Sequence, residues 1–124
     1  MNLIDTTEKL SQFCDVLSKQ NFITVDSEFI REHTYYPKLC LLQIGYDGDA
    51  AIVDPLAKDM DLSPFFAILD NQNIVKVFHA GRQDIEIFYN LTGKIPNNVF
   101  DTQIAAMVCG FADNIGYGNL VQSI

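Results

Sequence analysis

A tight turn between two apolar segments is the feature that most constrains the fold of this chain. The dipeptide Asp47-Gly48 separates LCLLQIGY, residues 39–46, from AAIV, residues 50–53. Asp-Gly favours a two-residue β-hairpin turn, because both residues tolerate positive φ. An earlier apolar segment, residues 22–28, has the composition of a strand. The sequence therefore predicts three strands, two of them joined by a hairpin.

The rest of the chain alternates between helical and extended patterns. An amphipathic helix capped by Asp5 precedes the first strand and ends near Gln20. After the hairpin, we predict helices at 63–70, 81–91 and 101–109, with strands at 74–78 and 99–100. A hairpin followed by alternating units predicts one α/β domain. Its mixed sheet would join a three-stranded antiparallel part to parallel strands, with helices flanking it.

Composition limits the classes of protein that this chain represents. Its 124 residues suit one compact domain, and its hydrophobic fraction of 48% is enough for a core. No apolar run approaches the ~18 residues of a membrane span. The net charge of −8 disfavours a general nucleic-acid coat, because phosphate contacts need Lys and Arg. An enzyme that meets phosphate through bound cations stays compatible with this charge.

The cysteines and the first residues of the chain indicate a cellular compartment. Cys14, Cys40 and Cys109 are odd in number, lack CxxC spacing and lie in apolar contexts. We interpret them as reduced core thiols. The first ten residues show no secretory signal pattern. The sequence therefore predicts a cytoplasmic protein.

Two acids end the first predicted strand, with a single residue between them. Asp26 and Glu28 project from the same face, because side chains at i and i+2 of a strand share a face. Two carboxylates at this spacing are suited to bind one divalent cation, or to help bind a pair. The alternative is a strand end in solvent with two acids on its wet face. The local pattern favours neither interpretation.

A third acid lies on the inward side of a predicted helix. Asp84 shares an apolar stripe with Phe88 and Leu91, whereas Glu86 falls on the polar outward face. A buried carboxylate without a partner is costly. Asp84 therefore needs either a basic partner or a bound metal.

The residues alone leave two possible partners for Asp84. One is a salt bridge to Arg82 or Lys76, and the other is a metal ion shared with Asp26 and Glu28. We favour the metal, since Arg82 would have to reach around the helix.

Two further polar residues stand at element boundaries. Asp101 precedes a helical segment and is predicted to be a structural N-cap. His79 directly follows the predicted strand at 74–78, in VFHAGRQD. A histidine there is more often a hydrogen-bonded structural residue than a ligand, but a strand's carboxyl end also makes it a candidate site residue.

Three segments together resemble the ribonuclease D family. They are ITVDSEFIREHTYYPKLCLLQI, VFHAGRQDIEIF and VFDTQIAAMVCG, in the order and at the spacing typical of that family. The family belongs to the DEDD superfamily of 3′–5′ exonucleases, so the resemblance implies a ribonuclease H-like fold. It extends over essentially the whole chain.

The resemblance also implies a site and a reaction. Asp26, Glu28 and Asp84 match family residues that hold two divalent metal ions, usually Mg²⁺ or Mn²⁺. The implied reaction is hydrolysis of RNA 3′ ends, such as those of tRNA precursors, with release of nucleoside 5′-monophosphates. Under the same resemblance, we expect His79 and Phe29 to contact the substrate.

One family motif is not found. A Y-x3-D segment should supply a fourth acid, but Cys109 stands four residues before Asp113, and Val121 stands four after Tyr117. We therefore expect residues 1–124 to be the N-terminal portion of an exonuclease domain, without its third motif and the helical RNA-binding domains. Such a portion would have little activity alone, and its uncovered apolar surface would favour self-association. A DNA exonuclease of the same superfamily and a non-catalytic binding module are the alternatives.

Overall fold

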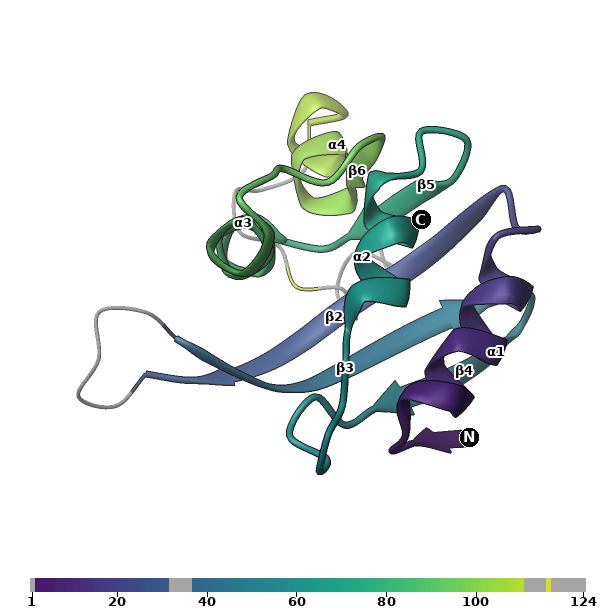
Figure 1. The fold of residues 1–124 in the computed structure, drawn as a ribbon. Coiled ribbons are helices and arrows are strands. Elements are labelled where there is room, and N and C mark those ends of the chain that lie inside the picture. The colour runs from purple at the N-terminus through teal and green to yellow at the C-terminus, as the bar shows by residue number, and fades with distance from the viewer. Residues whose placement is uncertain (1, 32–36, 111–115, 117–124) are drawn as a thin grey trace.

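Six strands form one mixed sheet in the computed structural model, which describes residues 2–31, 37–110 and 116 (Figure 1). The strands are β1 (Asn2–Ile4), β2 (Phe22–Ile30), β3 (Lys38–Tyr46), β4 (Asp49–Val53), β5 (Val75–Phe78) and β6 (Val99–Asp101). The helices are α1 (Thr7–Leu17), α2 (Ser63–Asp70), α3 (Arg82–Thr92) and α4 (Thr102–Val108). The Tyr117 and Asp113 segments of the expected third motif lie outside the described residues.

The sheet combines an antiparallel centre with parallel flanks. Its strand order is β1-β4-β3-β2-β5-β6. Strands β2, β3 and β4 pair antiparallel, whereas β1 runs parallel to β4, and β5 and β6 extend the other side in parallel. The predicted mixed sheet with flanking helices is confirmed. Strand β1 was not among the predicted strands.

The predicted hairpin turn joins β3 to β4. Asp47 and Gly48 both have positive φ, of 44° and 75°, as the type I′ hairpin turn requires. The turn fixes the register in which Gly45 lies opposite Ala50 and Tyr46 opposite Asp49. The dipeptide therefore determines how the central strands align.

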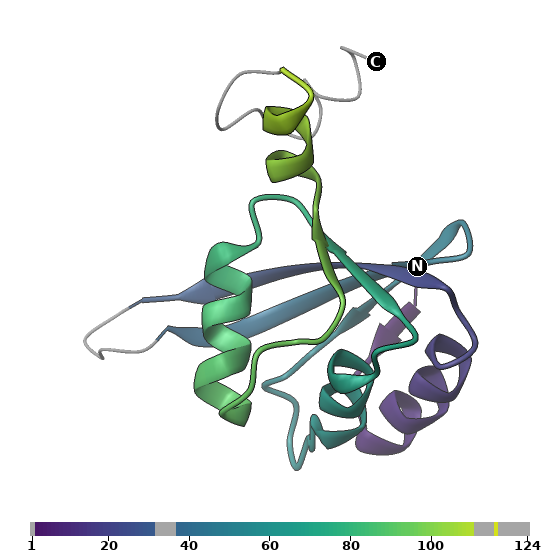
Figure 2. The same ribbon diagram turned by 90° about the horizontal axis from the view of Figure 1, so that it is seen from above.

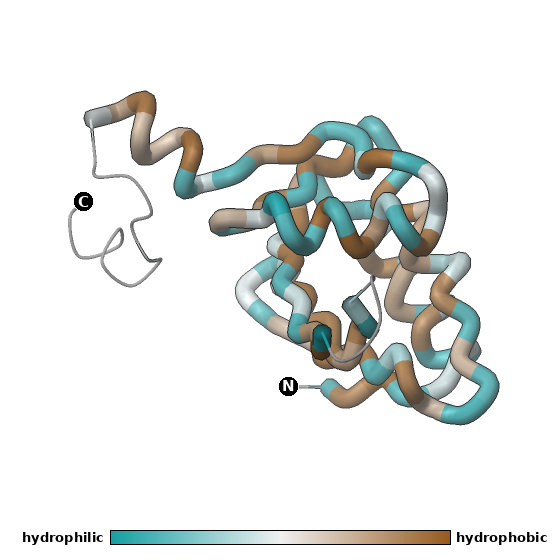
Figure 3. Tube along the Cα trace, turned by 90° about the vertical axis from the view of Figure 1, so that its left-hand side faces the viewer, coloured by the Kyte–Doolittle hydropathy of each residue, from teal (hydrophilic) through white to brown (hydrophobic). Residues whose placement is uncertain are grey.

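One face of the sheet carries the hydrophobic core. Along β2, Ile23, Val25 and Ser27 are buried, while the residues between them are exposed. The buried side chains join those of α1, α2 and α3 in one core cluster. Figure 2 shows α1 and α2 on one side of the sheet and α4 projecting on the other side. Figure 3 shows apolar stretches of the trace alternating with hydrophilic ones along the helices.

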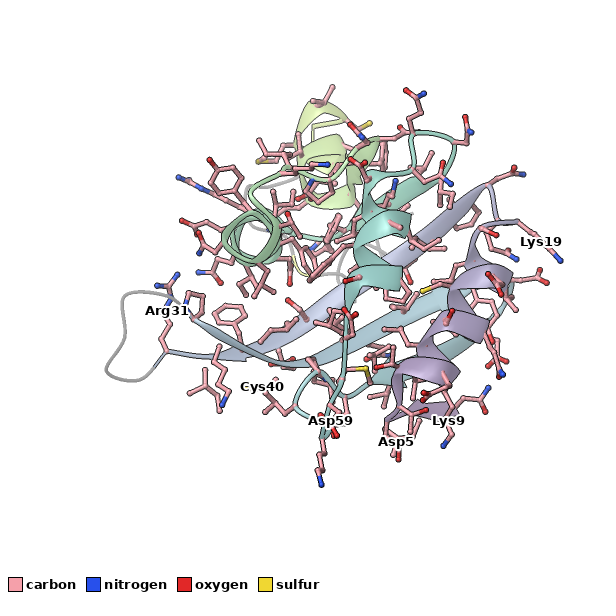
Figure 4. The ribbon with its side chains drawn as sticks, in the orientation of Figure 1. Asp5, Lys9, Lys19, Arg31, Cys40 and Asp59 are labelled. Atoms are coloured by element: carbon pink, nitrogen blue, oxygen red, sulfur yellow. The ribbon has the colours of Figure 1, made fainter. Side chains whose placement is uncertain are left out.

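Two local predictions need correction. Thr6 rather than Asp5 caps α1, since the Thr6 side chain accepts from the Lys9 backbone N–H, while Asp5 forms an ion pair with the Lys9 side chain at 3.0 Å (Figure 4). Of the three cysteines, Cys14 alone is buried: Cys40 on β3 is half-buried, and Cys109 at the C-cap of α4 is exposed. Among the described residues, no helix has both the length and the apolarity to cross a bilayer.

Candidate active site

The two acids of β2 lie on the face of the sheet opposite the core. Asp26 and Glu28 are exposed, whereas Ser27 between them is only 7% exposed and points to the covered face. This alternation is the ordinary two-residue period of a strand. The predicted common face of Asp26 and Glu28 is confirmed.

Parallel pairing brings the carboxyl ends of β5 and β6 to one edge, beside the middle of β2, which continues past Asp26 and Glu28 to Ile30. Thr24 pairs with Val77, so two residues further on Asp26 and His79 come to the same level of the sheet. Asp26, His79 and Thr102 line one hollow of about 470 Å³ at this edge. Open α/β sheets commonly bind ligands at the carboxyl ends of their strands.

Asp84 lies in the first turn of α3 and faces inward. It is 8% exposed, and Glu86 on the same helix is exposed, so both predicted orientations are confirmed. Phe88 is buried as predicted, but Leu91 is half exposed because α3 extends past the edge of the core there. A carboxylate in the first turn of a helix is favoured by the exposed backbone N–H groups of that turn.

The partner of Asp84 is a hydroxyl group that the sequence analysis did not consider. Ser27 Oγ donates a hydrogen bond to Asp84 Oδ1. In the part of the chain that the structure describes, no basic side chain forms an ion pair with Asp84. The salt bridge to Arg82 or Lys76, weighed as the alternative, does not form.

The environment of Asp84 disfavours its ionised form. Burial raises the pKa of this carboxyl, and the nearby charge of Asp26 raises it further. The hydrogen bond from Ser27 acts in the opposite direction but does not outweigh burial. Asp84 is therefore a carboxyl group whose charge lacks compensation in this part of the chain.

Lys76 is not a salt-bridge partner of Asp84 but links two backbone segments. It is fully buried on β5, and its Nζ donates to the backbone oxygens of Asn71 and Asn97. Burial lowers the pKa of Lys76 to about 8, against a smaller opposing effect of Asp70. Lys76 thus links the segments that follow α2 and precede β6.

Asp101 is the N-cap of α4, as predicted. Its side chain accepts from the backbone N–H groups of Gln103 and Ile104. Burial opposes the ionisation of Asp101, but N–H donors from Gly81, Ala80, Gln103 and Ile104 together lower its pKa. Asp101 is therefore held as a carboxylate.

The two predicted substrate contacts, His79 and Phe29, differ in their surroundings. His79 is half-buried at the end of β5, with Nδ1 2.8 Å from Thr102 Oγ1. Phe29 follows a bulge in β2 and packs partly against the core. Sequence reasoning missed Ser27 and Thr102. The strand period was a usable signal for Ser27, since it places this hydroxyl on the same covered side as Asp84.

The three predicted metal ligands do not form one cluster here. Within residues 2–31, 37–110 and 116, no group of three His, Cys, Asp or Glu side chains is placed to hold a metal ion. The reason is geometric, because Asp26 and Glu28 project from the open face while Asp84 lies toward the covered one. The donors are nevertheless carboxylate oxygens, which hard divalent cations prefer.

Comparison with known proteins defines the class of this chain. A family model described as 3′-5′ exonuclease matches residues 1–124. The chain belongs to this 3′–5′ exonuclease family. Its sequence is 52% identical over 122 residues to ribonuclease D of Sphingobium indicum, covering 98% of this chain and 31% of that protein. The same identity and coverage hold for ribonuclease D of Acidiphilium cryptum. The predicted resemblance to ribonuclease D is confirmed.

Solved structures support the same assignment. The crystal structure of Escherichia coli RNase D matches with a TM-score of 0.90 and 38% identity, over 99% of this chain and 33% of that one. The catalytic core of RRP6 from Trypanosoma brucei matches with a TM-score of 0.83 and 31% identity, over 91% of this chain and 32% of that one. The fold is therefore ribonuclease H-like. The chain spans about a third of the length of the curated relatives that it matches.

Proposed function

We propose that this chain forms part of the catalytic domain of a metal-dependent 3′–5′ exoribonuclease of the ribonuclease D type. The observation that carries the proposal is Asp84, a buried carboxyl group close to Asp26 with no cationic partner among the described residues. Perturbed carboxyl groups of this kind concentrate at functional sites. The Escherichia coli relative is described as an exoribonuclease involved in structured RNA processing.

Asp26, Glu28 and Asp84 are the proposed ligands of divalent cations, Mg²⁺ or Mn²⁺, two of them in the complete enzyme. When bound, such ions supply charge neutralisation at the phosphate and a more acidic water. The chain's own contribution is to place Asp26 and Glu28 on the open face of β2 and Asp84 on its covered side, where the Ser27 hydroxyl group orients Asp84. The raised pKa of Asp84 is consistent with a group that ionises fully once a cation is present.

The proposed substrate is the 3′ end of an RNA, with tRNA precursors as the class that the family suggests. His79 lines the same hollow as Asp26, which supports a contact to the terminal nucleotide. Phe29 is the second proposed contact, since it follows Glu28 directly at the bulge in β2. A cytoplasmic location completes this proposal.

Metal binding tests the proposal without requiring turnover. We expect Mn²⁺, titrated calorimetrically, to bind the chain, and Asp84→Asn to weaken that binding at least tenfold. Glu86→Gln is the matched control, because it removes one negative charge from the exposed side of the same helix. Equal affinities of the wild-type chain and Asp84→Asn would overturn the assignment of Asp84.

Activity is a separate question for a chain of this length. We expect residues 1–124 alone to release little mononucleotide from single-stranded RNA or DNA in Mn²⁺, because no third-motif acid is present in the expected pattern. We also expect the chain to self-associate through exposed apolar residues of α4, including Ile104 and Val108. Robust release of mononucleotides would contradict the first expectation, and a monomeric mass in light scattering the second.

A further inference from the structure

The Asp101 carboxylate binds two chain segments at once. Its Oδ1 accepts from the backbone N–H groups of Gln103 and Ile104 at 2.9 and 3.4 Å, which is the ordinary cap of α4. The same Oδ1 also accepts from Ala80 N at 3.0 Å, and Oδ2 accepts from Gly81 N at 2.8 Å. Because both carboxylate oxygens also accept from the loop at Ala80 and Gly81, this carboxylate does more than begin a helix.

The loop whose N–H groups donate these two bonds has an unfavourable backbone. Ala80 has a φ of 53°, in the left-handed region that non-glycine residues rarely occupy. Gly81 has no room for a side chain, since a Cβ there would lie 2.4 Å from Phe78 Cβ. Conformations of this kind persist where surrounding groups hold them in place. The two bonds from Asp101 supply that restraint.

Thr102 adds a second connection to the same loop. Its hydroxyl group donates to the Phe78 backbone oxygen at 3.2 Å and lies 2.8 Å from His79 Nδ1. A hydroxyl group has one proton, which the bond to Phe78 uses. Thr102 Oγ1 can then serve only as the acceptor toward the ring, an assignment that requires Nδ1 of His79 to carry a hydrogen and that the spectra described below test.

We propose that Asp101 and Thr102 form a positioning unit that fixes the loop between β5 and α3 and the Nδ1–H form of His79. This loop leads from His79 directly to the first turn of α3, where Asp84 lies. Asp101 and Thr102 are thus positioning residues for both ends of the loop. Their importance for catalysis rests on the proposed function, but the geometry that they impose does not.

The ring of His79 reports the Thr102 contact. In long-range ¹H–¹⁵N spectra of the chain, at a pH where the ring is neutral, we expect Nδ1 of His79 to be the protonated nitrogen. Thr102→Val should shift the ring toward the Nε2–H form, whereas Thr102→Ser should retain the wild-type signature. A wild-type ring that is already Nε2–H, or a Thr102→Val spectrum equal to wild type, would overturn this part of the proposal.

Mn²⁺ affinity reports the Asp101 contact. Asp101→Asn places an amide donor where one carboxylate oxygen accepts from the loop, and we expect Mn²⁺ affinity to fall roughly 10–100-fold. Thr6→Ala is the control, because it removes the N-cap of α1, remote from the loop, and should leave affinity unchanged. Unchanged affinity in Asp101→Asn would overturn the role of Asp101. No Mn²⁺ binding by the wild-type chain would refute the proposed function instead, and the His79 spectra would still decide the positioning unit.

Discussion

Replacement of Lys76 by methionine should remove a specific pH dependence from the stability of this chain. Lys76 is fully buried, and burial lowers its pKa from 10.5 to about 8. Methionine has a similar length and no charge. Stability here means the free energy of unfolding of the chain without metal or RNA.

The magnitude follows from the difference between folded and unfolded pKa values. A difference of 10.5 minus about 8 corresponds to about 3 kcal/mol, at ~1.4 kcal/mol per pKa unit. The folded state binds its proton more weakly than the unfolded state. The cost of the buried charge is therefore fully present below pH 8 and disappears as pH rises toward 10.5, so this residue makes stability increase over that interval.

Methionine also has a cost that does not depend on pH. The backbone oxygens of Asn71 and Asn97 would lose the Lys76 Nζ donor. Asn71 O keeps the Ile74 N–H at 3.3 Å, and the loss of hydrogen bonds to a charged donor costs about 1.5–3 kcal/mol. At neutral pH, the gain from removing the buried charge opposes the loss of these hydrogen bonds. The test of the Lys76 pKa is therefore the change in stability with pH, and not the stability of Lys76→Met at one pH.

The assay is urea unfolding of the wild-type chain and Lys76→Met at several pH values across this interval. Relative to the variant, the wild-type chain should gain about 3 kcal/mol by the upper end of the interval. Lys9→Met is the matched control, because Lys9 is exposed and forms an exposed ion pair with Asp5. Parallel profiles for the wild-type chain and Lys76→Met would refute the reasoning, since they would mean that the Lys76 pKa is not lowered by folding.

Three more predictions concern the site and the core. Asp84→Asn should stabilise the metal-free chain near neutral pH and lose that advantage on acidification. The reason is that the raised pKa of Asp84 reflects a cost of its ionised form in the folded chain, which protonation removes. Thermal melts of both chains at two pH values test this. Gly81→Ala should destabilise the chain by about 1–3 kcal/mol, because the new Cβ would clash with Phe78. Ala80→Gly relieves a positive φ, so it should leave the free energy of unfolding unchanged or raise it by up to ~1 kcal/mol. Opposite results in urea unfolding would contradict the loop geometry. Phe88→Ala should cost about 3–5 kcal/mol by cavity formation, and a loss under ~1 kcal/mol would show that this ring is not in the core.

The sequence was most informative where a local rule fixes a structure. Asp47-Gly48 predicted the hairpin because few residue pairs tolerate two positive φ values. Helical periodicity separated buried Asp84 from exposed Glu86, since two residues of helical rotation, about 200°, place them on opposite sides. Asp101 was predicted as a cap from its position alone, and it is one.

The features that escaped prediction all depend on distant partners. Strand β1 has three residues, too few to show a period, and it forms by pairing with β4 about fifty positions later. The second role of Asp101 requires Ala80 and Gly81 to return beside it. Lys76 was weighed only as a salt-bridge partner of Asp84. Its burial depends on hydrogen bonds to two backbone oxygens, those of Asn71 and Asn97. Contacts between residues that are distant in the sequence leave no local pattern from which to predict them.

The two faces of β2 explain why this chain keeps a costly carboxyl group. Asp26 and Glu28 stand on the open face, while the hydroxyl group of Ser27 crosses to the covered face and bonds Asp84. This bond restrains Asp84 but leaves it with a raised pKa, so folding alone does not compensate its charge. An amide would satisfy the same hydroxyl donor without that cost. The proposed cation, and not stability, would then account for an acid at this position. The opposite responses expected of Asp84→Asn in stability and in Mn²⁺ affinity separate the two explanations.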